Sequence, residues 1–189
     1  LRSILRQDPN IIMIGEIRDF ETVDIAIKSA LTGHLVISTL HTTTASGAIA
    51  RLINMGVEPY LINSSLVCVT SQRLVRKVCP YCKEEYELRK DIVESLKLNL
   101  DKIKKAVFFR GKGCERCFNL GYSGRTALAE VLLLTPAVRE LILEQGQEHM
   151  IKEQARKEGM KTLRECGLEE ASYGNTSLEE VLRVTAPDE

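Results

Sequence analysis

The chain has 189 residues, no formal net charge at pH 7, 44% hydrophobic residues and 28% charged residues. This length can bury one core plus a smaller module, and the composition is ordinary for a globular protein. No apolar stretch approaches the roughly 18 residues of a membrane-spanning helix, and no signal peptide opens the sequence. The sequence begins without Met, so we expect it to be a fragment of a longer chain.

The neutral total hides an uneven distribution of charge. Residues 1–72 hold five basic and six acidic side chains, residues 73–125 hold fourteen and seven, and residues 126–189 hold seven and thirteen. A basic middle and an acidic tail are compatible with ordinary solvated surface. They also suit subunit contacts or an anionic partner, and both interpretations stay open at this point.

The first third of the chain predicts a β-α-β unit. Two short apolar runs rich in β-branched residues are joined by a segment with helical spacing, which is typical of parallel buried strands. The expected elements are, in order, the end of a helix at 1–7 broken before Pro9, a strand at 11–15, a helix at 20–32 stopped by Gly33, a strand at 34–40, a helix at 44–54, and a helix from Pro59 that carries Leu61, Ser65, Val69 and Leu74.

Polar side chains follow both expected strands. Glu16, Arg18 and Asp19 come directly after the first strand, and His41 ends the second. Ligands of β-α-β units bind beyond the carboxyl ends of the strands. A carboxylate and an imidazole at that edge are suited to acid–base or phosphate chemistry.

Two Cys-x-x-Cys pairs form the second informative pattern. Cys79 and Cys82 are separated from Cys114 and Cys117 by 31 residues. Each pair can present two sulfurs to one point, so that together they offer the four thiolates that Zn²⁺ prefers. Disulfides, a redox dithiol and an iron–sulfur site are weaker alternatives. The spacer leaves space for a helix at 91–98 and a strand at 107–110, and Cys68 and Cys166 are expected as free thiols at apolar helical positions.

The last third predicts one strand followed by short amphipathic helices. Gly121, Gly124 and Arg125 are expected to precede a strand at 126–134 that rejoins the main domain. Pro136 then starts the helical run, and Thr176, Ser177 and Glu179 resemble the start of the last helix.

These segments together resemble the hexameric secretion ATPases that drive type II secretion and type IV pilus assembly. Residues 11–19 are similar to the Walker B segment of that family and residues 32–41 to its histidine box. Further matches are Gln72-Arg73-Leu74, the two cysteine pairs, Gly121-Tyr122-x-Gly-Arg125 and Leu178-Glu-Glu-Val-Leu-Arg183. Six ordered matches cover nearly the whole chain, and this is far more specific than one strand that ends in an acid.

The resemblance implies a role for each candidate residue. Glu16 would orient or deprotonate the water that attacks the γ-phosphate, and His41 would sense that phosphate or contact a neighbouring protomer. Arg2, Arg6, Arg18 and His34 are further candidates for nucleotide contacts, one of the first two as an arginine finger. For Arg18 a local carboxylate is the alternative partner, as is usual for charged residues at strand ends. For His34, at the start of its strand, a structural hydrogen bond is the preferred role. A reducing cytosol favours zinc at Cys79, Cys82, Cys114 and Cys117 over disulfides.

One part of an ATPase site is missing from the sequence. No Gly-x-x-x-x-Gly-Lys-Ser/Thr occurs, since the single Gly-Lys, at Gly111 and Lys112, lacks the preceding glycine. Gly15 stands where many P-loop ATPases place a magnesium-binding Asp. In the family the phosphate loop lies upstream, so we expect this chain to hold half of an active site.

The sequence thus predicts an α/β protein: part of a RecA-like P-loop ATPase core at 1–76, an inserted Cys₄ zinc module at 77–122, and a returning strand with a carboxyl-terminal helical subdomain at 123–189. The full-length protein would be a homo-hexameric ATPase that uses ATP and Mg²⁺. It would work at the cytoplasmic face of the inner membrane with the membrane platform and cytoplasmic proteins of its machine. The resemblance does not separate type II secretion, pilus assembly and DNA uptake.

Two alternatives come from other functional classes. A zinc-ribbon nucleic-acid-binding domain is favoured by the basic middle of the chain. It is disfavoured because only two aromatic residues there, Phe108 and Phe109, are close together for base stacking. The other alternative is a non-catalytic interaction domain.

Overall fold

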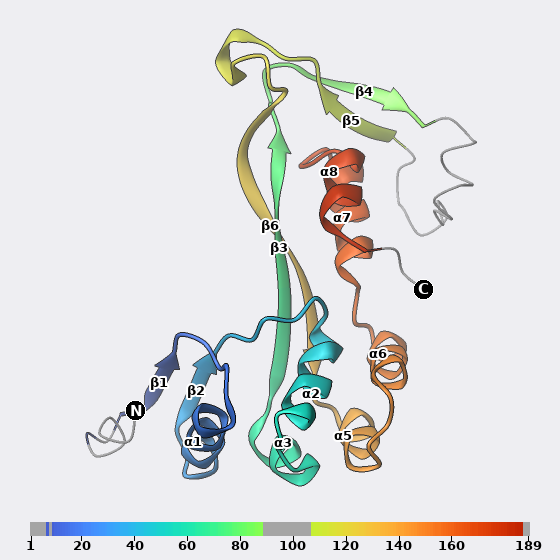
Figure 1. Cartoon of the computed structure of the whole chain (residues 1–189). Coiled ribbons are helices and arrows are strands. Elements are labelled where there is room, and N and C mark those ends of the chain that lie inside the picture. The colour runs from blue at the N-terminus through green and yellow to red at the C-terminus, as the bar shows by residue number, and fades with distance from the viewer. Residues whose placement is uncertain (1–6, 8, 89–106, 187–189) are drawn as a thin grey trace. The chain divides into compact units, whose positions relative to one another are not determined.

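The structure is a computed structural model that describes residue 7, residues 9–88 and residues 107–186. The chain divides into two compact units. Unit 1 comprises Leu1–Ser71 and Val131–Met160, and unit 2 comprises Gln72–Glu130 and Lys161–Glu189. Figure 1 shows the order of the helices and strands along the chain.

Unit 1 begins with the predicted β-α-β unit. Strand β1 (Ile11–Ile14) pairs in parallel with β2 (Leu35–Ser38), and helix α1 (Phe20–Leu31) connects them. The side chain of Asp19 caps α1 by accepting a hydrogen bond from the Thr22 amide at 2.8 Å. Gly33, with φ of 99°, ends the connection in the left-handed conformation expected for it.

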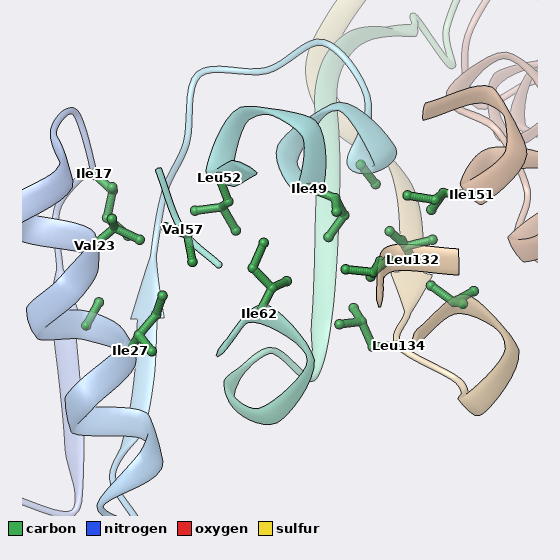
Figure 2. Packing of buried hydrophobic residues seen from close by; sticks show 14 of the residues in the cluster. Ile17, Val23, Ile27, Ile49, Leu52, Val57, Ile62, Leu132, Leu134 and Ile151 are labelled. Atoms are coloured by element: carbon green, nitrogen blue, oxygen red, sulfur yellow. The ribbon is translucent and has the colours of Figure 1, made fainter. Parts of the chain in front are cut away.

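Four further helices lie in the described residues of unit 1. They are α2 (Ala45–Asn54), α3 (Pro59–Ser65), α5 (Pro136–Leu143) and α6 (Glu148–Lys157). Their buried faces form one apolar cluster with α1 and β1, in which residues near 20–60 meet residues near 130–155. Figure 2 shows this packing, with Val23 and Ile27 on one side, Ile62 between, and Leu132 and Ile151 on the other. The fold of unit 1 therefore depends on chain segments far apart in sequence.

Two long strands contribute residues to both units. Strand β3 (Cys68–Val78) pairs with β6 (Tyr122–Leu133), and the intervening 43 residues include both cysteine pairs. Within unit 1, the amide of Leu134 donates to the carbonyl oxygen of Val67 at 3.1 Å. The strand expected at 126–134 is thus confirmed, with an earlier start.

Unit 2 combines the cysteine-bearing segment with two helices. Strand β4 (Lys83–Glu87) pairs antiparallel with β5 (Val107–Gly111), followed by the short 3₁₀ helix η3 (Glu115–Cys117). Helices α7 (Leu163–Ser172) and α8 (Leu178–Val184) belong to the same unit. Phe108 of β5 is fully buried in an apolar cluster with Ala171, Leu178 and Val181, so β5 and the two helices share a core.

A glycine allows α7 to approach its neighbours closely. A Cβ atom at Gly167 would lie 2.5 Å from Cγ1 of Val181 and 3.0 Å from Cδ1 of Leu128. Any larger residue at this position would push α7 away from α8 and from β6.

A buried carboxylate fastens α8 to β3. Glu180 is 1% exposed, and its oxygens accept hydrogen bonds from the Arg76 amide at 3.0 Å, from the Arg76 guanidinium, and from Arg183 at 2.8 and 2.9 Å. The hydrogen bond from Arg183 lowers the pKa of Glu180; burial opposes this effect, and the bonds from Arg76 add to it. Glu180 therefore stays ionised inside unit 2.

Several sequence-based expectations need correction. The helix from Pro59 ends at Ser65, so the prediction that it carries Val69 and Leu74 is wrong, and both residues lie in β3. The β-branched run after Leu66 favours a strand once a partner strand is available. Cys68 is exposed on β3 and is not a core thiol, and Gly124 and Arg125 lie within β6 instead of before it.

Other expectations are confirmed or lie outside the described residues. Cys166 is a partly buried free thiol on α7 that donates to the Ala129 carbonyl oxygen at 3.2 Å. The expected strand at 107–110 is β5. The helix end expected at 1–7 and the helix expected at 91–98 fall on residues that the structure does not describe, apart from Gln7.

Replacing Glu180 with Gln should destabilise unit 2. The change keeps the shape but removes the charge that two guanidinium groups and one amide bind, so the free energy of unfolding should fall by about 2 kcal/mol. Urea denaturation at pH 7 is the measurement, with Glu179→Gln on the exposed side of α8 as the control. Because the pKa of Glu180 is lowered in the folded protein, its contribution should disappear as the pH falls below the ordinary value of 4.5 toward the folded value. Equal stability of the two variants at pH 7 would contradict this role.

Candidate functional site

The register of β1 and β2 builds the candidate active site. Ile14 lies opposite Ser38 in the parallel pair, so the chain leaves both strands at the same edge. Two hydrogen bonds continue the pairing beyond the strands: the Thr39 hydroxyl donates to the Gly15 carbonyl oxygen at 2.7 Å, and the Ile17 amide donates to the Thr39 carbonyl oxygen at 3.0 Å. The segments that carry Glu16 and His41 are therefore fixed next to each other.

Glu16 and His41 are in direct contact at this edge. Nε2 of His41 lies 2.9 Å from Oε2 of Glu16. An ionised carboxylate only accepts hydrogen bonds, so Nε2 carries the proton in this contact. The imidazole side chain is 77% exposed and the carboxylate side chain 35% exposed, so both groups remain accessible from solvent.

Arg18 binds the other oxygen of the same carboxylate. Its Nη2 lies 2.6 Å from Oε1 of Glu16. The hydrogen bond from Arg18 lowers the pKa of Glu16 most, the hydrogen bond from His41 lowers it further, and desolvation opposes both. Glu16 is therefore ionised at neutral pH, and it can accept a hydrogen bond or a proton from a bound molecule.

His34, another candidate for a nucleotide contact, does not lie at this edge. His34 precedes β2 and is thus at the opposite end of that strand from His41. Its Nδ1 lies 2.9 Å from the carbonyl oxygen of Ser29 and 3.2 Å from the hydroxyl of Thr32, which is the kind of structural hydrogen bond expected for it. Arg2 and Arg6 are outside the described residues.

The four cysteines of the two pairs meet in unit 2. The Sγ atoms of Cys79, Cys82, Cys114 and Cys117 all lie within 4.8 Å of one another. The separations are 4.0 Å for Cys79 and Cys114, 3.8 Å for Cys82 and Cys117, and 3.7 Å for Cys114 and Cys117. A tetrahedral zinc with Zn–S bonds of about 2.3 Å has S···S edges of about 3.8 Å. The cluster can therefore hold a metal ion.

Backbone amides around the cluster donate hydrogen bonds that can stabilise thiolates. The amide of Gly113 donates to Sγ of Cys82 at 3.3 Å, and the amides of Cys114 and Gly121 donate to Sγ of Cys117 at 3.2 and 3.3 Å. Burial raises the pKa of Cys117, but these amides and its neighbouring cysteines outweigh burial and bring the pKa down to about 6. Burial raises the pKa of Cys82 to about 12. A bound cation would oppose this effect of burial on Cys82, because metal ligation stabilises the thiolate.

Two glycines let the cysteine loops approach each other. A Cβ atom at Gly111 would lie 2.0 Å from the carbonyl oxygen of Gly121, and that oxygen accepts a hydrogen bond from the Cys79 amide at 2.9 Å. Gly121 also has a positive φ of 76°. Sequence reasoning recognised Gly121 as part of a motif but missed this packing role, because the contact joins loops ten residues apart.

The chain is similar in sequence to proteins of one known family. A sequence model of the family described as Type II/IV secretion system protein matches residues 1–183. The chain is 52% identical over 185 residues to the type IV pilus assembly ATPase PilB of Thermus thermophilus, covering 98% of this chain and 21% of the relative. It is 50% identical over 186 residues to the type II secretion system ATPase E of Vibrio cholerae, covering 98% of this chain and 36% of the relative.

Solved structures show the same fold. The pilus retraction motor PilT with bound ADP matches with a TM-score of 0.66 and 26% identity, covering 99% of this chain and 42% of that chain. The ATPase DotB of Legionella pneumophila matches in fold with a TM-score of 0.63 and 23% identity, covering 97% of this chain and 40% of that chain. The chain spans between a fifth and about a third of the length of the two curated relatives.

The match to the family covers both sites, because residues 1–183 include Glu16, His41 and all four clustered cysteines. It also agrees with the mixed α/β fold shared with PilT and DotB. The resemblance found in the sequence is thereby confirmed at the level of the family. The chain belongs to the Type II/IV secretion system protein family.

Proposed function

We propose that the protein of which this chain is a part hydrolyses ATP to power type II protein secretion or type IV pilus assembly. The observation that carries the proposal is the contact between Glu16 and His41 at the common edge of two parallel strands, in a chain of this family. Relatives at 52% and 50% identity are named as a pilus assembly ATPase and a secretion ATPase.

In this proposal Glu16 acts on the attacking water. Its carboxylate is ionised and partly exposed, so it can orient the water and accept its proton. His41 holds the carboxylate through Nε2 and is free to turn toward a phosphate oxygen when nucleotide is bound. Such a role suits phosphoryl transfer, in which positioning and charge stabilisation supply most of the catalysis. Arg2, Arg6 and His34 remain candidates for nucleotide contacts.

The rest of the site is proposed to come from outside this chain. We assign the α/β part to a RecA-like core whose phosphate loop lies upstream, and the working form to a homo-hexamer. Mg²⁺ would accompany the nucleotide, and no ligand for it is assigned at Gly15, which has no carboxylate.

No helix in residues 7, 9–88 and 107–186 is both long and apolar enough to cross a membrane. We place the enzyme at the cytoplasmic face of the inner membrane, beside the platform proteins of its machine.

The cysteine cluster is proposed to be a structural zinc site. The observed Sγ separations fit a four-coordinate zinc and leave no open position for a substrate. We retain the proposed organisation of a module at 77–122 inserted between an ATPase part at 1–76 and a carboxyl-terminal part at 123–189. In that arrangement the metal stabilises the loops and takes no part in ATP hydrolysis.

The nucleic-acid alternative loses the pair of adjacent rings that was expected to stack bases. Phe108 is fully buried, and Nζ of Lys83 lies 4.1 Å from the centre of the Phe109 ring. Neither ring is thus presented as a free stacking surface. A binding assay with DNA or RNA at increasing salt separates this class from the motor, since phosphate-dominated binding falls steeply with salt. An interaction domain without catalysis would instead leave ATP turnover unaffected by changes at Glu16.

Replacing Glu16 with Gln in the full-length enzyme should preserve ATP binding and reduce turnover by about 10²-fold or more. The amide keeps the shape of the side chain but cannot accept the proton. Steady-state ATPase assays and nucleotide-binding measurements test this, and His41→Ala should also lower turnover. Glu58→Gln, at an exposed position before α3 where the side chain makes no capping bond, is the control. Near-normal turnover of Glu16→Gln would remove Glu16 from the proposed mechanism.

The 189-residue chain alone should bind ATP weakly and hydrolyse almost none. Most phosphate contacts in P-loop enzymes come from the glycine-rich loop, which this sequence lacks. Calorimetry with Mg-ATP measures the affinity. Binding in the low micromolar range would show that the chain contains a nucleotide site other than the proposed half-site.

Purified protein should contain about one zinc ion per chain. Replacing Cys79 and Cys114 together by Ser leaves two thiolates, so the metal should be lost, and elemental analysis measures it. Cys68→Ser with Cys166→Ser is the matched control, because both are free thiols outside the cluster.

The proposed module should loosen on metal loss, since metal binding and folding are coupled in such sites. The core of unit 1 should stay folded, and unfolding of the whole chain by a chelator would contradict the separate module.

A further inference from the structure

Arg18 forms an ion pair with a carboxylate two residues away in the sequence. The sequence suggested a nucleotide contact for Arg18, yet its Nη2 lies 2.6 Å from Oε1 of Glu16. His41 occupies the other oxygen, Oε2, at 2.9 Å. The carboxylate is thus held from two sides, by the turn that follows β1 and by the loop that follows β2.

The neighbouring acid does not compete for Arg18. Asp19 uses its carboxylate to cap α1 through the Thr22 amide, and the same hydrogen bonding lowers the pKa of Asp19. The cap also fixes the backbone of the turn that separates Arg18 from the helix. Among the described residues, the charged groups that act on Glu16 are Arg18 and His41.

We propose that Arg18 is a positioning residue for the hydrolysis proposed above. Its guanidinium holds Oε1 of Glu16 while His41 holds Oε2, so the plane of the carboxylate is fixed. Each carboxylate oxygen has two acceptor sites, and one on each oxygen stays available for the attacking water. Arg18 acts through Glu16 and does not touch the nucleotide.

The contact has a kinetic signature that a simple surface ion pair would lack. Arg18 favours the ionised form of Glu16, so the base stays ready at mildly acid pH. Without Arg18 the pKa of Glu16 rises toward its ordinary value, and the acid limb of the rate profile moves to higher pH. A loosely held carboxylate also positions water less well, which lowers kcat without changing ATP affinity.

The experiment compares Arg18→Met and Arg18→Lys in the full-length enzyme. For Arg18→Met we expect kcat to fall about tenfold with KM unchanged, and the acid limb of kcat to move to higher pH. Arg18→Lys keeps a positive charge without the planar fork, so the acid limb should stay near that of the parent while kcat falls less. All these proteins retain His41, so a difference between their acid limbs belongs to Arg18.

Lys28→Met is the matched control. The ion pair between Lys28 and Asp24 has an N–O distance of 2.6 Å, the same as that between Arg18 and Glu16. The side chains of Lys28 and Asp24 are 68% and 32% exposed, close to the 73% and 35% of Arg18 and Glu16, but this pair lies within α1. Its loss should leave the kinetics unchanged.

Three outcomes overturn the inference. A raised KM with normal kcat in Arg18→Met would assign Arg18 to the nucleotide, and unchanged kinetics would make its contact with Glu16 incidental. Equal effects of Arg18→Met and Lys28→Met would point to a general loss of surface charge.

The inference rests on the proposed function but fails separately from it. If the full-length parent enzyme shows no ATP turnover, the proposed function falls. If Glu16→Gln retains turnover, the role of Glu16 falls and that of Arg18 with it, whereas loss of turnover in Glu16→Gln with an unaltered Arg18→Met refutes only the role of Arg18.

Discussion

The hydrogen-bonded register of β1 and β2 is the constraint on which the candidate active site depends. With Ile14 opposite Ser38, the bonds made by Thr39 carry the pairing one step beyond the strands and bring Glu16 to His41. A slip of one residue would move Ile12 and Ile14 from the buried to the exposed face of β1. Core packing and site geometry are therefore secured by the same bonds, and a mutation that disturbs one would disturb the other.

The two candidate sites are built on different physical grounds. The site at Glu16 relies on backbone pairing and on charge–charge contacts at a partly exposed edge, where single ion pairs contribute little to stability. The cysteine cluster relies on buried and partly buried cysteines, on backbone amides that donate to their sulfurs, and on the close approach of Gly111 and Gly121. Under the proposed function, this division predicts that catalysis can be lost without unfolding, and that a metal can be lost from the cysteines while the core of unit 1 remains.

The ion pair of Arg18 changes how the Walker B-like segment is understood. Residues 16 to 19 of the sequence read as a row of charged candidates around one isoleucine. In the structure each polar member has its own partner: Glu16 meets His41 and Arg18, and Asp19 caps α1. The charges are thus divided between a catalytic candidate, the group that holds it, and the helix that follows. The proposed mechanism needs this division, because a base must be held without being neutralised.

Local sequence pattern was sufficient for the β-α-β unit, for the end of its helix at Gly33, and for the candidates Glu16, His41 and the four cysteines. Strand period, helix stop signals and ligand spacing are encoded within a few residues. It failed after Ser65, where an apolar run has the spacing of a helix and becomes β3 because it pairs with β6, more than forty residues away. It also could not assign partners to Arg18, to Glu180 or to Phe108. Those contacts depend on how side chains from separate elements meet, and this is decided by tertiary packing.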